Sequence, residues 1–244
     1  YTIMTIDEIY RLVQTFANKE QRGFITPSEF NLLAKQAELE LYNKRLSVIK
    51  EKSPNKKNVG VYGESLAPEI AKQDIAPFYR VQKVGIVNDS LSYKGASGNI
   101  DTHYIETIFC LPDEENDIST NIPVDIVEPK DVNQILRSSL VKPSIEFPIA
   151  LIGQGNGSVV SISVFPESIT NIIVYHYYNN NSPKWNYITV AGKPVYDAFN
   201  SNDFKISERT HGELVVKILE YLGVTIREPE IVQYAQASEL KADS

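Results

Sequence analysis

The spacing of apolar residues changes twice along the chain, and this change limits the folds that the chain can adopt. Near the start, apolar side chains recur at the period of an amphipathic helix. They are Ile6, Ile9, Tyr10, Val13 and Phe16. From about Phe78 to Phe204, short β-branched and aromatic runs are bounded by Gly, Pro and Asn, which is typical of strands. The helical period returns in residues 208–222, so the sequence predicts an α+β protein whose helices flank a β-rich region.

Two capping boxes mark the starts of the first two helices. They are Thr5-Ile6-Asp7-Glu8 and Thr26-Pro27-Ser28-Glu29. In such a box, the threonine hydroxyl accepts a hydrogen bond from the glutamate amide, and the glutamate carboxylate accepts one from the threonine amide. We expect helices over residues 6–18 and 27–50. At about 1.5 Å per residue the second helix would be roughly 35 Å long, so it should rest on neighbouring elements.

The connection between these helices, NKEQRGFITPSEF, has the spacing of a calcium-binding loop. Asn18 would occupy the first ligand position, Gly23 the sharp turn and Glu29 the bidentate position. The same alignment places a cation, Arg22, at a ligand position and Pro27 inside the loop, and the sequence contains no second, partnering loop. A glycine turn followed by a capping box explains these residues without an ion. The sequence therefore favours a helical hairpin over a calcium site.

Residues 51–77 contain three prolines and two glycines, which predicts a long loop or extended arm. Long loops of this kind are often functional or become ordered on a partner. A basic cluster, Lys52, Lys56 and Lys57, lies in this arm. It could touch DNA or an acidic partner; a solvated loop or a protein contact is the favoured interpretation.

The β-rich region contains six strand-like runs. They are FYRVQKVGIV, THYIETIFCLP, FPIALIGQ, SVVSISVFP, NIIVYHYY and NYITV. A short helix over about 129–140 interrupts them. Because most connections are too short for a crossover helix, we expect an antiparallel sandwich or barrel.

The end of the chain is expected to be helical again. The helix over 208–222 should stop at Gly223 in a left-handed cap, and Glu228-Pro229-Glu230 should start another helix towards Leu240. Both terminal regions have an apolar face that needs a partner, so they should form one helical bundle. The expected organisation comprises four regions: a helical hairpin over 1–50, an arm over 51–77, a β-rich domain over 78–205 and C-terminal helices over 206–244.

Residues that could carry chemistry are scattered rather than grouped. The three histidines, His103, His176 and His211, fall in different predicted elements, whereas catalysis or metal binding needs convergent groups. Cys110 is the single cysteine, which excludes an intrachain disulfide and a multi-cysteine metal cluster. The sequence therefore predicts no catalytic, cofactor-binding or metal-binding residue, and no enzyme.

Two further motifs have simpler explanations. The glycine-rich run 153–157 precedes a strand-like run and lacks the Gly-Lys-Ser/Thr of a phosphate-binding loop, so it predicts a hairpin turn. The acidic run 113–117 follows a proline and predicts a solvated loop. The net charge of −7 weighs against a general affinity for nucleic acid. No run resembles a signal peptide or a membrane span, so we expect a protein made, or assembled into something larger, in a cytoplasm.

Two stretches resemble structural proteins of tailed bacteriophages. TIDEIYRLVQTFANKEQRGFITPSEFNLLAKQAELELYNKRL, residues 5–46, resembles a recurrent opening in structural proteins of crAss-like phages. ELVVKILEYLGVTIREPEIVQYAQ, residues 213–236, resembles the closing helices of phage head–tail connector proteins. Together they cover roughly a quarter to a third of the chain.

The resemblance implies a non-enzymatic subunit without a cofactor, present in the virion and assembled in the host cytoplasm. Copies would form a ring below the portal, around the DNA exit channel of a podovirus-type particle. Loops and the β-rich domain would contact the portal or other tail proteins, and DNA would pass without sequence-specific binding. The alternatives are an auxiliary capsid, fibre-docking or tail protein, a calcium- or carbohydrate-binding module, or a cell-wall hydrolase carried by the tail.

Overall fold

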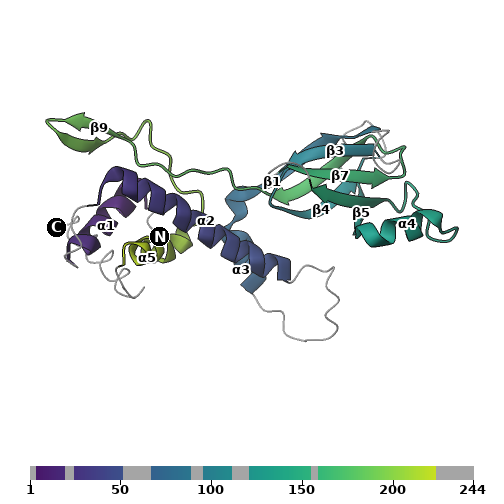
Figure 1. The fold of residues 1–244 in the computed structure, drawn as a ribbon, viewed down its shortest axis with the longest axis horizontal. Helices are drawn as coiled ribbons and strands as arrows, with labels where there is room; N and C mark the ends of the chain where they lie inside the picture. Colours follow the sequence, from purple (N-terminus) through teal and green to yellow (C-terminus); the bar gives the residue numbers. More distant parts are fainter. Residues whose placement is uncertain are drawn as a thin grey trace. The chain divides into compact units, whose positions relative to one another are not determined.

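The computed structural model describes residues 4–19, 25–51, 67–88, 96–111, 121–154 and 159–223. It divides into two compact units (Figure 1). One unit consists of Tyr1–Phe78 together with Asn180–Ser244, and the other of Tyr79–Asn179. The protein is therefore α+β, with a helical unit formed by the two ends of the chain and a β-rich unit formed by its middle.

The first two helices begin where the capping boxes predict. Helix α1 spans Ile6–Lys19 and helix α2 spans Pro27–Glu51. Glu8 Oε2 accepts a hydrogen bond from the Thr5 amide at 2.7 Å, and the Glu8 amide donates to Thr5 Oγ1 at 3.3 Å. The Thr26 amide likewise donates to Glu29 Oε2 at 2.9 Å. Both helix starts are thus fixed by hydrogen bonds between residues three apart.

The remaining helices of this unit pack on α1 and α2. Helix α3 spans Ala67–Asp74, and short 3-10 turns follow at Ala76–Phe78 and Glu208–Thr210. Helix α5, His211–Tyr221, contacts both α1 and α2, while α3 contacts α2. Gly223 has a φ of 73°, which confirms the predicted left-handed cap after α5. The predicted second C-terminal helix lies outside the described residues.

The expected extended arm over 51–77 is wrong from Ala67 onwards, because α3 is helical. Pro68 falls in the first turn of this helix, where its missing N–H breaks no hydrogen bond. Ala71 and Asp74 are buried, so tertiary packing supports a helix whose composition indicated a loop. The three lysines of the basic cluster lie outside the described residues.

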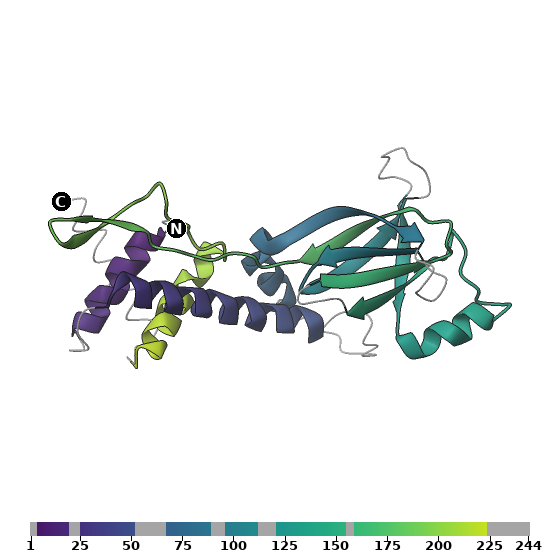
Figure 2. The ribbon, with the colours of Figure 1, turned by 45° about the horizontal axis from the view of Figure 1, so that its top comes forward.

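Two more strands belong to the helical unit. Strands β9, Tyr187–Val190, and β10, Lys193–Tyr196, form a separate two-stranded antiparallel sheet. Their contacts place residues 180–205 with the helices, whereas the sequence pattern grouped them with the other strands. Figures 1 and 2 show this hairpin projecting beyond α1.

The described residues of the β-rich unit form one sheet of eight strands. They are β1 Tyr79–Gly85, β2 Val87–Asn88, β3 Ala96–Asp101, β4 Tyr104–Cys110, β5 Ile122–Val127, β6 Ile149–Gln154, β7 Val159–Phe165 and β8 Asn171–Tyr177. The strand order is β1-β8-β4-β5-β6-β7-β3-β2, and every neighbouring pair is antiparallel except β5–β6. The parallel pair departs from the expected antiparallel pattern. Helix α4, Pro129–Arg137, lies in the long connection that a parallel pair requires.

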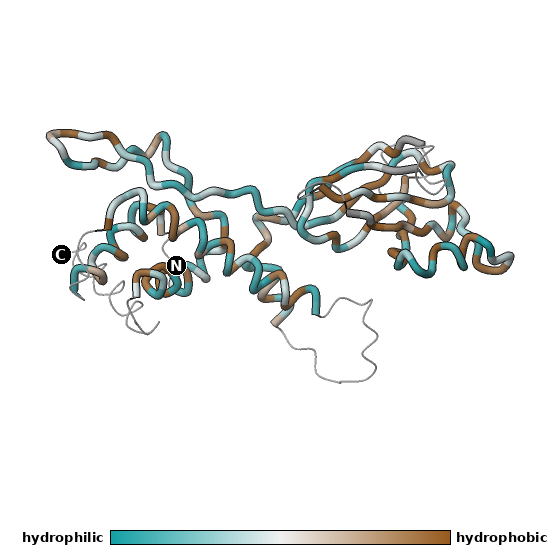
Figure 3. Tube along the Cα trace, viewed as in Figure 1, coloured by the Kyte–Doolittle hydropathy of each residue, from teal (hydrophilic) through white to brown (hydrophobic). Residues whose placement is uncertain are grey.

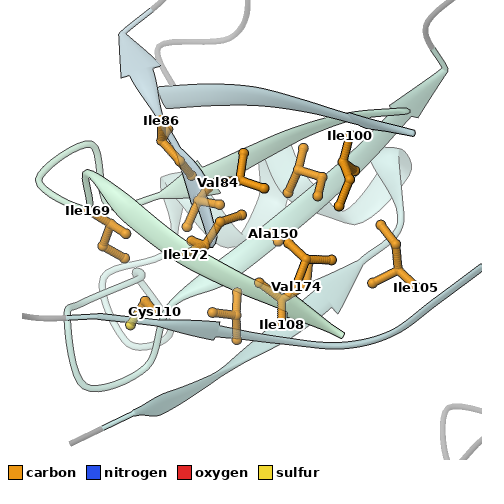
Figure 4. Packing of buried hydrophobic residues seen from close by; sticks show 13 residues of the cluster. Val84, Ile86, Ile100, Ile105, Ile108, Cys110, Ala150, Ile169, Ile172 and Val174 are labelled. Carbon is orange, nitrogen blue, oxygen red and sulfur yellow. The ribbon is translucent and has the colours of Figure 1, made fainter. Parts of the chain in front are cut away.

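The sheet curves until its two ends nearly meet, since β1 also contacts β3. Its interior is filled by aliphatic side chains from most of the strands (Figure 4). Gly98 on β3 lies against β1, and a Cβ atom at this position would be 2.6 Å from Val84 Cγ1. A glycine is therefore needed where the sheet closes on itself.

Candidate interaction surface

The strongest candidate site is the β9–β10 hairpin, which is held to the helices by the single tryptophan of the chain. Trp185 comes just before β9 and is 4% exposed. Its indole Nε1 donates a hydrogen bond to Asp7 Oδ1 of α1 at 2.9 Å. Its amide donates to Asn31 Oδ1 at 2.7 Å, and its carbonyl accepts from Asn31 Nδ2 at 3.0 Å. The base of the hairpin is thus fixed to both α1 and α2.

Aromatic rings complete this attachment. The Trp185 ring centroid is 4.3 Å from that of Tyr10 on α1. Tyr187 and Tyr196 are cross-strand partners, and their rings stack against Trp185 at 5.8 and 5.7 Å. A hollow of about 510 Å³ opens beside the stack, lined in part by Arg11. Because the indole is covered by its neighbours, the stack serves to anchor the hairpin rather than to offer an open aromatic platform.

Beyond this base, the hairpin presents an uncovered apolar face. The register pairs Ile188 with Val195 and Val190 with Lys193, so these four side chains lie on one face. Ile188, Val190 and Val195 are 54%, 52% and 45% exposed. In the hydropathy view, hydrophobic residues are visible along this hairpin (Figure 3). Within the described residues, no third strand pairs with either β9 or β10.

The segment that carries the hairpin is fixed at both ends by one buried carboxylate. Glu38 of α2 accepts hydrogen bonds from Asn181 Nδ2 at 2.9 Å and from the Lys205 amide at 2.7 Å. It also accepts one from the Ile206 amide at 3.3 Å. Burial raises the pKa of the Glu38 carboxyl, and the hydrogen bonds oppose this shift. Glu38 therefore joins the two ends of the 180–206 segment to α2.

A charged network fixes the helices on which the hairpin rests. The buried Asp74 of α3 accepts from Arg45 Nε at 2.9 Å and from Arg209 Nη2 at 3.1 Å. Arg45 Nη2 also donates to Glu213 Oε2 of α5 at 2.6 Å. These pairs link α2 to α3 and α5, so α2, one of the two helices that bind the hairpin, is itself held by its neighbours.

A second exposed apolar segment lies in the β-rich unit, after α4. Its members are Leu140, Val141, Ile145 and Phe147, and two of them, Leu140 and Phe147, are 94% and 74% exposed. The backbone is nevertheless ordered, because Ser138 Oγ accepts from the Leu140 and Val141 amides at 3.2 Å. Ser144 and Phe147 also exchange backbone hydrogen bonds. Hydrophobic residues are visible in this segment as well (Figure 3).

The residues singled out for chemistry do not converge. His176 lies on β8 in the β-rich unit and His211 begins α5 in the helical unit, and burial lowers the pKa of both. His103 packs edge-on against Tyr178 at 5.4 Å. Cys110 is fully buried, as expected for a small apolar residue, and burial raises the pKa of its thiol. Among the described residues, no group of three His, Cys, Asp or Glu side chains could hold a metal ion.

Several predicted loop motifs cannot be placed. Arg22, Gly23, the acidic run 113–117 and most of the glycine-rich run 153–157 lie outside the described residues. The strands that flank the glycine-rich run, β6 and β7, are antiparallel neighbours, as the hairpin prediction requires. In the part of the chain that is described, no helix has the length and apolar character needed to cross a membrane.

Sequence reasoning did not identify the attachment of the hairpin. The single Trp185 carried a signal, because aromatic side chains dominate core packing and a buried indole N–H usually finds a hydrogen-bond partner. Glu38 also carried a signal, because it stands at helical spacing from Ala34, Leu41 and Tyr42 on the buried face of α2, where a carboxylate needs a hydrogen-bond donor. No protein-family model matches the chain, and no curated protein sequence matches it.

Proposed function

We propose that this chain is a structural subunit of a bacteriophage particle, forming a ring in the head–tail connector below the portal. The phage assignment rests on the resemblance of residues 5–46 and 213–236 to structural proteins of crAss-like phages. The ring would surround part of the DNA exit channel. The chain would act by assembly and not as an enzyme.

The observation that carries the assembly role is the exposed apolar face of the β9–β10 hairpin. A two-stranded sheet is marginally stable in water by itself. This one is nevertheless held firmly at its base by Trp185 and leaves Ile188, Val190 and Val195 uncovered. Rigid, exposed apolar surfaces of this kind mark protein–protein contacts.

The arrangement of the helices supports the same role. Helix α5 packs on α1 and α2, which is consistent with one bundle made from both ends of the chain. We propose that the bundle forms the body of the subunit and that the β-rich unit is a barrel-like insertion. Such an insertion would reach neighbouring portal or tail proteins.

The charge of the chain fits a channel through which DNA passes. With a net charge of −7, the chain would repel phosphate groups on average. We therefore propose that DNA is transported without sequence-specific binding. The expected location is the virion, after assembly in the host cytoplasm.

The test is the composition and symmetry of the purified phage particle. Mass spectrometry should detect the chain in particles separated from host protein, and cryo-electron microscopy should place its copies around the tail axis. Copy numbers that follow the capsid would instead identify an auxiliary capsid protein. Absence of the chain from particles would contradict both assignments.

A further inference from the structure

We propose that His176 makes the β-rich unit sensitive to acid, because a proton taken up by its buried imidazole releases strand β1 from strand β8. The sheet would then open at the place where its two ends nearly meet. All the parts of this device lie within the β-rich unit. It is therefore independent of the β9–β10 hairpin and of the proposed function.

His176 lies on the inner face of the curved sheet. On β8 it follows Ile172 and Val174 at alternate positions, and both of these side chains belong to the aliphatic cluster. His176 is 1% exposed, and neither of its ring nitrogens has a hydrogen-bond partner among the described residues. Most buried polar groups in proteins are hydrogen-bonded, so this histidine is an exception that needs a physical explanation.

The surroundings of His176 keep its imidazole neutral. Burial lowers the pKa of the ring, and the positive charge of Arg80 lowers it further. A protonated ring would bring a charge and two N–H donors into the aliphatic interior, where neither nitrogen meets an acceptor in the described part of the chain. Proton uptake therefore favours a state in which the ring reaches water.

The neighbours of His176 direct this effect to strand β1. The cross-strand partner of His176 on β1 is Arg80, so protonation places two cations opposite each other. Its partner on β4 is Ile105, which carries no charge. Strand β1 also lies at the edge of the sheet and pairs with β8 alone, whereas β4 pairs with both β8 and β5. The strand that is repelled is therefore the one held by fewer hydrogen bonds.

The other titratable groups at this end of the sheet do not offset the burial of His176. Glu106 of β4 interacts with Tyr79, which alternates to the outer face of β1. Asp101 ends β3 and is exposed. His103 is exposed as well and itself becomes positive in acid. No described carboxylate raises the pKa of the His176 ring.

The sign of the pH dependence follows from this lowered pKa. In the released state the imidazole reaches water and titrates near about 6.5, as a free histidine does. Below that pH the released state binds more protons than the closed sheet, so the equilibrium constant for release rises. The rise is at most about tenfold per pH unit, and it ends once the pH is below the pKa of the ring in the closed sheet.

Hydrogen exchange followed by mass spectrometry tests the device in the full-length chain. The protection of the β1 amides is measured from about pH 7.5 to about pH 5 and corrected for the pH dependence of intrinsic exchange. We expect this protection to fall by up to about tenfold per pH unit below about pH 6.5. The amides of β7, which pairs with both β6 and β3, should lose less protection and provide an internal reference.

Four variants separate the roles of the two facing residues. His176→Leu and His176→Gln replace the titrating ring by an apolar and a polar side chain, and β1 protection should then change less than about twofold over this range. Arg80→Gln removes the opposing cation and should reduce the loss of protection in acid. His103→Gln alters an exposed histidine at the same end of the sheet and should behave as the parent chain.

Three results would overturn the proposal. They are a parent chain whose β1 protection does not change with pH, the same loss of protection in both His176 variants, and equal losses in β1 and β7. NMR of the histidine rings in the parent chain gives a further measurement that needs no variant to fold. A His176 ring that titrates well below about 6.5 supports the device, whereas titration at or above about 6.5 overturns it.

Discussion

The indole of Trp185 and the carboxylate of Asp7 are hydrogen-bonded at 2.9 Å although 178 positions separate them in the chain. This bond joins the start of α1 to the base of the β9–β10 hairpin. Asp7 also forms an ion pair with Arg11 Nη2 at 2.8 Å. One carboxylate therefore binds both the next turn of α1 and the base of the hairpin. The proposed contact surface is therefore positioned by the first helix of the chain.

Replacing Trp185 should detach the hairpin. Trp185→Ala removes a buried indole and its contacts with the neighbouring aromatic rings. This change should destabilise the helical unit by about 3–5 kcal/mol. Trp185→Phe keeps a ring but loses the hydrogen bond to Asp7, and should cost about 1–2 kcal/mol. Denaturant unfolding followed by circular dichroism measures both. Tyr187→Phe is the control, and an Ala variant as stable as this control would contradict the anchoring role.

Gly98 should be required where the β-sheet closes. A Cβ at this position would meet Val84 Cγ1 at 2.6 Å and the Gly85 carbonyl oxygen at 3.1 Å. Gly98→Ala should therefore destabilise the β-rich unit by about 1–3 kcal/mol, as overpacking does. Gly85→Ala is a matched control, because nothing lies within 4 Å of its added Cβ. Equal thermal stabilities of the two variants would show that β1 and β3 do not approach as described.

The β9–β10 hairpin should become more stable when Ala191 in its turn is replaced by a residue that tolerates a positive φ. Ala191 has a φ of 50° and Gly192 a φ of 77°, so both central residues lie in the left-handed region. Alanine is strained there, and Ala191→Asn should stabilise the hairpin by about 0.5–1 kcal/mol. Slower amide hydrogen exchange at Val190 and Lys193 would report this. Ala191→Val, which is β-branched, should have the opposite effect; protection unchanged in both variants would contradict the turn geometry.

Glu38 should make stability fall as the pH rises. Burial raises the pKa of this carboxyl in the folded state. The contribution of Glu38 to the free energy of unfolding is therefore fully present below the pKa of an unfolded glutamate. That contribution is lost as the pH rises through the higher folded pKa. Glu38→Gln cannot ionise, so its stability relative to the parent chain should increase over this pH window.

The control for Glu38 lies two residues away on α2. Hydrogen bonds from Lys217 and Tyr221 lower the pKa of Glu40 in the folded state. The contribution of Glu40 to the free energy of unfolding is therefore present above the pKa of an unfolded glutamate and is lost as the pH falls. Glu40→Gln should therefore show the opposite trend in chemical unfolding across the same pH series. If the unfolding free energies of both variants, relative to the parent chain, changed with pH in the same direction, the raised pKa of Glu38 would be refuted.

Local sequence determined the elements whose hydrogen bonds close within a few residues. The two capping boxes predicted the starts of α1 and α2, and Gly223 predicted the cap of α5, because these signals act between neighbours in the chain. The apolar period also predicted the α+β class. These features need no information about the rest of the fold.

Tertiary structure alone decided the features that depend on distant partners. The composition of residues 67–74 indicated a loop, yet packing against α2 makes them helical. Residues 180–205 have the pattern of strands, yet Trp185 and Asn181 bind them to the helices through Asp7 and Glu38. The connection that contains α4 is long enough for a parallel β5–β6 pair, but only the folded sheet shows that the two strands are neighbours. In each case the deciding partner lies outside the segment, where no local pattern can specify it.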